Sequence, residues 1–260
     1  MLNKLLKKDL SKDMRWLWIL FVALIAVALL TKGCSELSDM AFFKILGILF
    51  DSIFYALAVN VILQPFLRNF LNFTKSLYGD ESYLTHTLPV TKNQIINSKF
   101  LTALIEMCLG FACLVVSLLI KFYSPTFFET VGALLSTVIA GKVSVGLTLS
   151  LIIFLVVVEF LMFLSMIFFA IVIAYRSKES RMLKTFLLTA AMALAAITVL
   201  SVFLVIALSI NGVKLTSATL VLPKKAFFSV IITGITVYCA IMITFYFLTK
   251  RAFNKGVNVD

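Results

Sequence analysis

Residues 78–92 read YGDESYLTHTLPVTK, the most distinctive polar passage between the long apolar runs of this chain. Gly79 predicts the end of the preceding helix, because glycine adopts the left-handed conformation of a helix C-terminus at little cost. Asp80 can cap a new helix, which ends by about Leu88 because Pro89 disfavours helical geometry in the residue before it. The passage therefore predicts a short helix that is bounded on both sides.

A second, longer helix is predicted to begin directly after this passage. Thr91 and Gln94 have the spacing of a capping box, and an apolar run follows them. Glu81 lies in the first turn of the short helix, where the helix dipole favours a negative charge. A short helix over 80–88, held between two membrane spans, is suited to being pushed by a protein outside the membrane.

The segments GDESYL and TLPVT resemble the passage "GDE-x-YL…TLPV-(S/T)" of the ABC type-2 exporter permeases from low-GC Gram-positive bacteria. The resemblance is to the small two-component peptide exporters, such as those for phenol-soluble modulins. It implies that 80–88 is a cytoplasmic coupling helix that docks on a separate ATPase subunit, and that ATP and Mg bind to that partner. It also implies a homodimer in the bacterial plasma membrane. The residues expected to contact the ATPase are Asp80, Glu81, Tyr83, Leu84 and Leu88. The alternative is an ordinary amphipathic loop between two spans.

The composition excludes a soluble globular protein. Of the 260 residues, 62% are hydrophobic and 13% are charged, and the mean hydropathy is +1.10. An all-α polytopic membrane protein is expected, because a helix satisfies its own backbone hydrogen bonds in lipid. The connecting segments are too short for a soluble domain, so one transmembrane domain, 1–260, is predicted. The net charge of +11 is attributed to the membrane-flanking Lys and Arg and not to nucleic-acid binding.

Six spans are predicted from the apolar runs, at 16–30, 40–66, 100–120, 143–174, 185–210 and 226–248. Residues 1–15 carry five basic side chains and leucines at helical spacing, which predicts an amphipathic helix in the lipid headgroup region. Residues 127–140 are apolar but too few to cross a bilayer, which predicts an interfacial or re-entrant helix between spans 3 and 4.

The distribution of basic residues predicts the orientation. Of the 23 Lys and Arg, 16 lie at the two termini, in 67–99 and in 175–184, and six lie in the loops of the other side. Because cytoplasmic loops are enriched in Lys and Arg, both termini and the 80–88 passage are expected in the cytoplasm.

Three carboxylates, Asp51, Glu106 and Glu159, lie inside predicted spans. A charged carboxylate at the bilayer centre costs about 2.5–3.5 kcal/mol on insertion scales, so such residues usually face a partner or water. They could line a translocation path for a cationic or amphipathic peptide, or they could pair internally, for example with Lys44. Glu159, in the middle of a long span, is the preferred candidate for the path.

No catalytic or metal-binding motif is found, so the chain is not expected to be an enzyme. The only Gly-Lys pair, Gly141-Lys142, lacks the remainder of a phosphate-binding loop, so any ATPase would be a separate polypeptide. The four cysteines form no C-x-x-C motif, and no H-E-x-x-H sequence is present. Two alternatives stay open: a permease of this layout for lipid, drug or glycan, and a passive membrane sensor or immunity protein.

Overall fold

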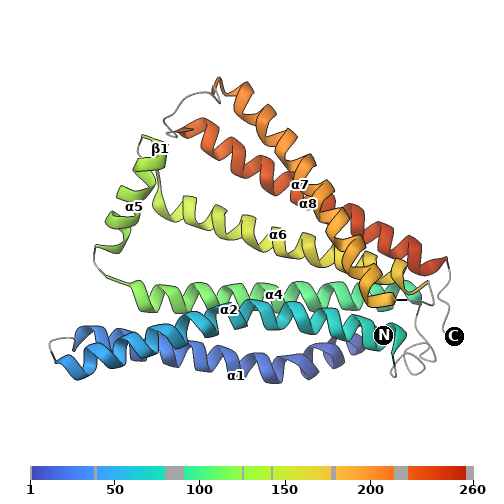
Figure 1. The fold of residues 1–260 in the computed structure, drawn as a ribbon, viewed down its shortest axis with the longest axis horizontal. Coiled ribbons are helices and arrows are strands. Elements are labelled where there is room, and N and C mark those ends of the chain that lie inside the picture. The colour runs from blue at the N-terminus through green and yellow to red at the C-terminus, as the bar shows by residue number, and fades with distance from the viewer. Residues whose placement is uncertain are drawn as a thin grey trace. The chain divides into compact units, whose positions relative to one another are not determined.

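The structure, a computed structural model, describes residues 2–37, 40–79, 91–124, 126–141, 143–176, 180–213 and 222–255. Nearly all of these residues are helical (Figure 1). The helices are α1 (Leu2–Glu36), α2 (Ala41–Tyr78), α4 (Lys92–Phe122), α5 (Phe127–Val138), α6 (Val145–Ala174), α7 (Arg181–Ile210) and α8 (Lys224–Asn254). Six of them, all except α5, are long and apolar enough to cross a membrane. The prediction of a helical protein with six helices able to span a membrane is therefore confirmed.

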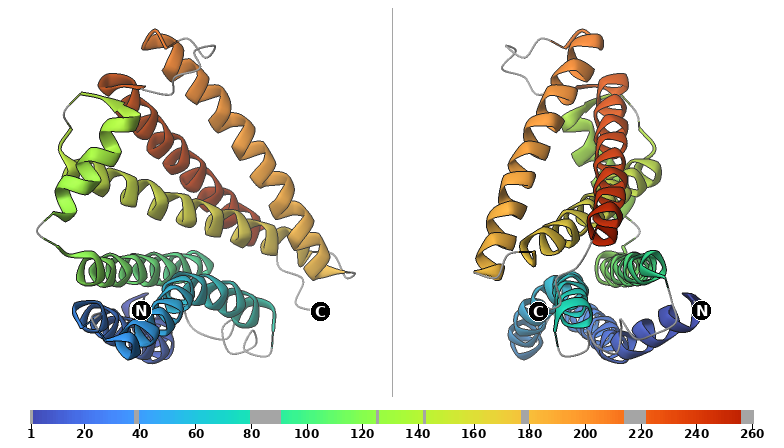
Figure 2. Two further views of the ribbon diagram at one scale, coloured as in Figure 1. Left: turned by 60° about the vertical axis from the view of Figure 1, so that its left-hand side comes forward. Right: turned by 90° about the vertical axis from the view of Figure 1, so that its right-hand side faces the viewer.

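The helices group into two compact units. Unit 1 comprises residues 1–124, in which α1, α2 and α4 pack against one another. Unit 2 comprises residues 125–260, in which α6 packs against both α7 and α8, and α5 contacts α6 (Figure 2). The sequence predicted one domain and did not indicate this grouping, because helix–helix contacts leave no pattern in hydropathy alone.

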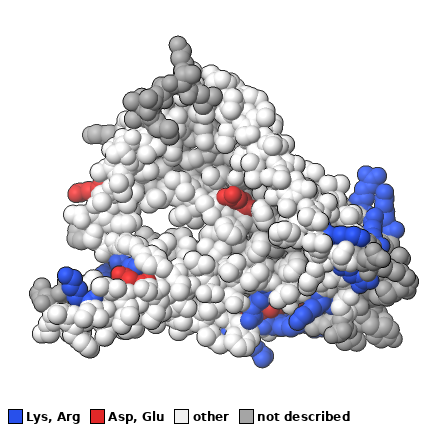
Figure 3. All heavy atoms as spheres, viewed as in Figure 1, with Lys and Arg blue, Asp and Glu red and all other residues white. Residues whose placement is uncertain are grey.

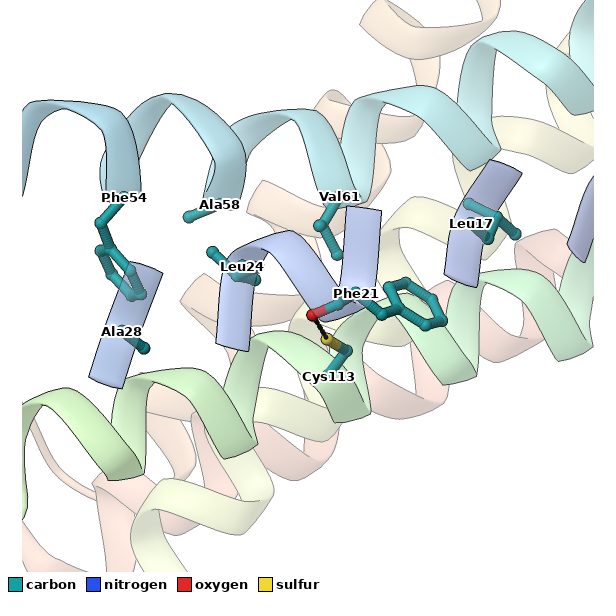
Figure 4. Packing of buried hydrophobic residues seen from close by; sticks show 8 residues of the cluster. All are labelled: Leu17, Phe21, Leu24, Ala28, Phe54, Ala58, Val61 and Cys113. Carbon is teal, nitrogen blue, oxygen red and sulfur yellow. Dashed lines mark hydrogen bonds between the residues drawn. The ribbon is translucent and has the colours of Figure 1, made fainter. Parts of the chain in front are cut away.

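The core of unit 1 is an apolar stripe along α1. Four of its side chains repeat at intervals of three or four residues, which places them on one helical face. They are Leu17, Phe21, Leu24 and Ala28, and all four are buried. This face meets Phe54, Ala58 and Val61 of α2 and Cys113 of α4 (Figure 4). The Cys113 thiol donates to the backbone carbonyl of Phe21 over 3.9 Å, so α4 is joined to α1 at the middle of the stripe.

The first two spans are longer than the sequence predicted. Residues 2–15 continue into the first span as one helix, and α2 runs through Pro65 to Tyr78 without ending. At 1.5 Å per residue, the 38 residues of α2 extend about 57 Å, well beyond a hydrocarbon core of about 30 Å. That residues 1–15 lie among lipid headgroups stays a prediction.

Unit 2 has a core of sulfur-containing and aromatic side chains. Met162 and Met166 of α6 pack with Ala196 of α7, and Tyr238 and Phe245 of α8 lie against them. The segment after α5 and the segment before α8 are joined by a two-residue parallel pairing of β1 (Ile139–Ala140) with β2 (Leu222–Pro223). This pairing was not predicted, because two residues are too few to show strand periodicity.

Candidate functional site

The predicted coupling helix, 80–88, lies outside the described residues. The proposed ATPase contacts therefore stay predictions: Asp80, Glu81, Tyr83, Leu84 and Leu88. The structure does describe the two ends that frame this passage. Helix α2 ends at Tyr78 and α4 begins at Lys92, as the sequence predicted.

Gly79 ends α2, but not in the way that was predicted. Its φ of −101° and ψ of −158° are extended, so the expected left-handed conformation is wrong. Its backbone N–H donates to the carbonyl of Lys75 over 3.1 Å. A β-carbon at Gly79 would lie 3.0 Å from both that oxygen and the Cα of Lys75. Glycine is favoured here because its backbone lies tightly against Lys75 in the last turn of α2.

The capping box at the start of α4 is confirmed. The Thr91 hydroxyl accepts from the backbone N–H of Gln94, and the Gln94 side chain accepts from the backbone N–H of Thr91, each over 3.3 Å. These two bonds satisfy N–H groups that have no partner within the helix. The start of α4 is therefore well defined.

A network of charged and amide side chains joins the three helices of unit 1 near this end. We call its five members the polar clamp: Asp9 and Asp13 of α1, Arg68 and Asn72 of α2, and Lys99 of α4. Lys99 Nζ lies 2.9 Å from Asp9 Oδ2. Asn72 donates to the Asp13 carboxylate, and Arg68 lies 3.9 Å from it. The clamp connects both helices that flank the 80–90 segment to α1.

The polar clamp was not predicted from the sequence. Asp9 and Asp13 are spaced four residues apart, and the next steps of four reach Leu17 and Phe21. The two carboxylates therefore continue the buried stripe of α1, and Asp13 is only 5% exposed. The sequence did contain a signal for this network, because the two aspartates lie on the same helical face as the apolar stripe. Carboxylates that only face lipid headgroups would have no reason to lie on that face.

Glu106 lies inside unit 1, adjacent to the clamp. Its side chain is fully buried, and Asn69 of α2 donates to its Oε2 over 2.7 Å. Asn69 also donates to the Pro65 carbonyl over 2.9 Å, so it is held in place by its own helix. Among the described residues, the other carboxyl oxygen of Glu106 has no hydrogen-bond partner. Glu106 thus joins α4 to α2, as internal pairing would predict, and its role in a path stays a prediction.

Asp51 lies near the opposite end of unit 1. Its carboxylate is 2.8 Å from Nζ of Lys121, which is the partner in place of the suggested Lys44. Lys121 Nζ is also 4.0 Å from the centre of the Tyr55 ring and 4.4 Å from that of Phe54. A cation held by a carboxylate and aromatic faces links α4 to α2 at this end.

Glu159 is exposed on α6 within unit 2. The side chain of Tyr238 in α8 lies close to the Glu159 carboxylate. Tyr238 packs against the Met162 and Met166 cluster, so Glu159 lies beside a flexible apolar surface. The three predicted path residues are thus divided between the two units, with Asp51 and Glu106 in unit 1 and Glu159 in unit 2.

Comparisons of the chain with protein-family models, with curated proteins and with solved structures found no match. Within the part of the chain that the structure describes, no three His, Cys, Asp or Glu side chains group as metal ligands would. The features that bear on function are therefore the helices that flank 80–90, the polar clamp and the embedded carboxylates.

Proposed function

We propose that the chain is the transmembrane subunit of an ATP-driven ABC exporter that moves amphipathic or cationic peptides out of the cytoplasm. Two copies work with separate ATPase subunits, which bind ATP and Mg. The 80–88 helix docks on the ATPase, and its motion is transmitted to α2 and α4. The proposal is supported by the resemblance of residues 79–91 to the coupling passage of such permeases, and by the packing around that passage.

The observation that carries the proposal is the polar clamp. Helix α2 precedes the 80–88 passage in the chain and α4 follows it. At the ends of these helices that are nearer to the passage, Arg68 and Asn72 of α2 contact Asp13 of α1. Lys99 of α4 pairs with Asp9 of α1. Ion pairs and side-chain amide hydrogen bonds that are mostly shielded from water resist separation of the helices. A displacement applied between Tyr78 and Thr91 would therefore move all three helices of unit 1 together.

The deepest part of this connection is the pair of Asn69 and Glu106. Glu106 lies about two helical turns beyond Lys99 along α4, and its bond to Asn69 extends the connection toward the middle of the spans. A rigid three-helix unit suits the transmission of a motion from a cytoplasmic ATPase into the membrane. Glu159, exposed beside the methionines of unit 2, is the proposed contact for a cationic cargo.

The experiment that tests the proposal is purification of the tagged full chain from its native membrane, followed by identification of the proteins that accompany it. An ATPase that is retained in stoichiometric amounts, and whose hydrolysis is stimulated in the reconstituted complex, is expected. A chain that purifies alone, and whose deletion changes no export, would contradict the exporter and favour the sensor or immunity protein.

A further inference from the structure

A pocket of about 360 Å³ opens at the end of unit 1 that lies away from the polar clamp. It is formed where α1 ends, α2 begins and α4 ends. Figure 3 shows basic and acidic side chains together at this end, where α1 is followed by α2. Its charged lining consists of Lys32, Lys44, Asp51 and Lys121.

The charges of this pocket do not balance. Asp51 is the only carboxylate among the lining residues that the structure describes, and it pairs with Lys121. Within the described chain, neither Lys32 nor Lys44 forms an ion pair, although Lys32 lies 5.5 Å from the centre of the Tyr123 ring. Among the described residues, these two cations therefore face one pocket without an ion-pair partner, which favours binding of an anionic group.

The position of the cations matches the depth of lipid headgroups. Lys32 lies four residues before the end of α1, Lys44 three residues after the start of α2, and Lys121 one residue before the end of α4. Each is at the end of a helix that is long and apolar enough to span a membrane. Long basic side chains at such ends extend to the membrane interface.

Apolar residues form most of the remaining wall of the pocket, and Thr31 and Ser35 add two hydroxyls that donate to carbonyls of their own helix. Phe43, Ile48 and Phe122 line it together with Gly47, whose missing side chain leaves room beside Cys34. On α2, Ile45 and Ile48 are exposed and continue this apolar surface outward. A ligand with a negatively charged head and an apolar tail fits this combination better than a small free anion does.

We propose that this pocket binds the phosphate headgroup of an anionic phospholipid, with Lys32 and Lys44 facing the phosphate and the acyl chains lying along α2. The general enrichment of Lys and Arg on the cytoplasmic side does not account for this cluster, because it lies at the other end of the helices from the polar clamp. Ammonium groups bind phosphate through charge-assisted hydrogen bonds. The site is independent of the transport proposal.

The test is lipid retention by the purified full chain, measured by native mass spectrometry during titration with phosphatidylglycerol or phosphatidylcholine. Wild-type chain should retain one phosphatidylglycerol in preference to phosphatidylcholine. The pair Lys32→Gln and Lys44→Gln should weaken that retention roughly 10- to 30-fold, as expected for the loss of two interfacial cations. The pair Lys32→Arg and Lys44→Arg should retain it, because arginine also binds phosphate.

The matched control is the pair Lys224→Gln and Lys225→Gln, two exposed lysines at the start of α8 that remove the same charge. Equal weakening by both glutamine pairs would overturn the proposal, and so would equal retention of the two lipids. Occupancy by inorganic phosphate that displaces phosphatidylglycerol would overturn the lipid assignment. If the double variant does not fold, Lys44→Gln alone, at an exposed position, should still weaken retention several-fold, and unchanged retention would overturn the site.

Discussion

Gly110 of α4 faces the backbone of Val61 in α2, and a β-carbon on Gly110 would lie 3.1 Å from the Val61 carbonyl oxygen. This carbonyl has no N–H donor from its own helix, because the residue four positions later is Pro65. The same β-carbon would lie 3.8 Å from the Pro65 ring. The two helices therefore approach each other closely at a point where α4 lacks a side chain and α2 lacks a backbone hydrogen bond, as small residues permit in membrane proteins.

Gly110→Ala should destabilise unit 1. Alanine is the better helix former by about 1 kcal/mol, but its methyl group meets backbone that cannot rotate aside, and overpacking typically costs about 1–3 kcal/mol. Thermal unfolding in detergent should show a lower midpoint. Gly33→Ala is the control, because a β-carbon there meets nothing within 4 Å. A Gly110→Ala midpoint equal to or above that of Gly33→Ala would contradict the close approach.

The ion pair of Asp9 with Lys99 should stabilise the packing of α1 on α4. The two side chains are 17% and 11% exposed, so each charge left alone is poorly solvated. Asp9→Asn and Lys99→Gln should each lower the free energy of unfolding by about 1–3 kcal/mol, and the double variant should cost less than their sum. Lys92→Gln, at an exposed position of α4, should change it by less than about 0.5 kcal/mol. Strict additivity in this cycle would mean that the pair contributes nothing.

The six long helices were predictable because apolar runs of such length have few other structures available in a membrane. Their ends were less predictable. Basic residues in 1–15 suggested a separate interfacial helix, whereas Asp9 and Asp13 extend the buried stripe of α1. Pro65 is compatible with a continuous α2, since only one backbone hydrogen bond of the helix is lost there.

The partners of the embedded carboxylates could not be found from the sequence. Lys44 is nearer to Asp51 in sequence, but Lys121 of another helix pairs with it, because the packing of α4 on α2 brings the two side chains together. Asn69, the partner of Glu106, is 37 residues away from it. Gly79 shows the same limit on a local scale: glycine predicted a helix end, whereas contact with Lys75 explains why glycine is needed.

Glu159→Gln should reduce peptide transport without disturbing assembly. Glutamine has nearly the size and shape of glutamate, so the packing of α6 on α8 is preserved while the negative charge is lost. A fall of about tenfold in transport rate, equivalent to ~1.4 kcal/mol, is expected for a cationic cargo. Glu129→Gln, at an exposed position in the first turn of α5, is the control. Transport unchanged by Glu159→Gln would leave the residue a packing partner only.

The orientation of the chain can be tested along a single helix. Ser11 and Ser35 are exposed near the two ends of α1. In a chain without its native cysteines, Ser35→Cys should react with an impermeant thiol reagent on intact cells, and Ser11→Cys only after permeabilisation. The reverse pattern would place the 80–88 passage outside the cell and exclude a cytoplasmic ATPase as its partner.

Coupling through 80–88 should depend on one charge and one apolar contact. No Lys or Arg lies between Lys75 and Lys92, so a basic side chain of the ATPase is the proposed partner of Glu81. A charge-assisted hydrogen bond contributes about 1–3 kcal/mol, so Glu81→Lys should weaken ATPase affinity by roughly 5- to 150-fold. Leu84→Asp should weaken it also, because a carboxylate would replace an apolar contact.

The control for this last test is Tyr78→Ala, at the end of α2 and outside the short helix, which should reduce coupling less. ATPase association should be measured by copurification, and transport in vesicles that contain both subunits. All three variants should insert normally, because none of the three positions lies in the apolar middle of a span. If Glu81→Lys and Leu84→Asp both keep full association and full transport, residues 80–88 form only a connecting loop. Loss of transport with intact association would instead place the defect after docking, in transmission through α2, α4 and the polar clamp.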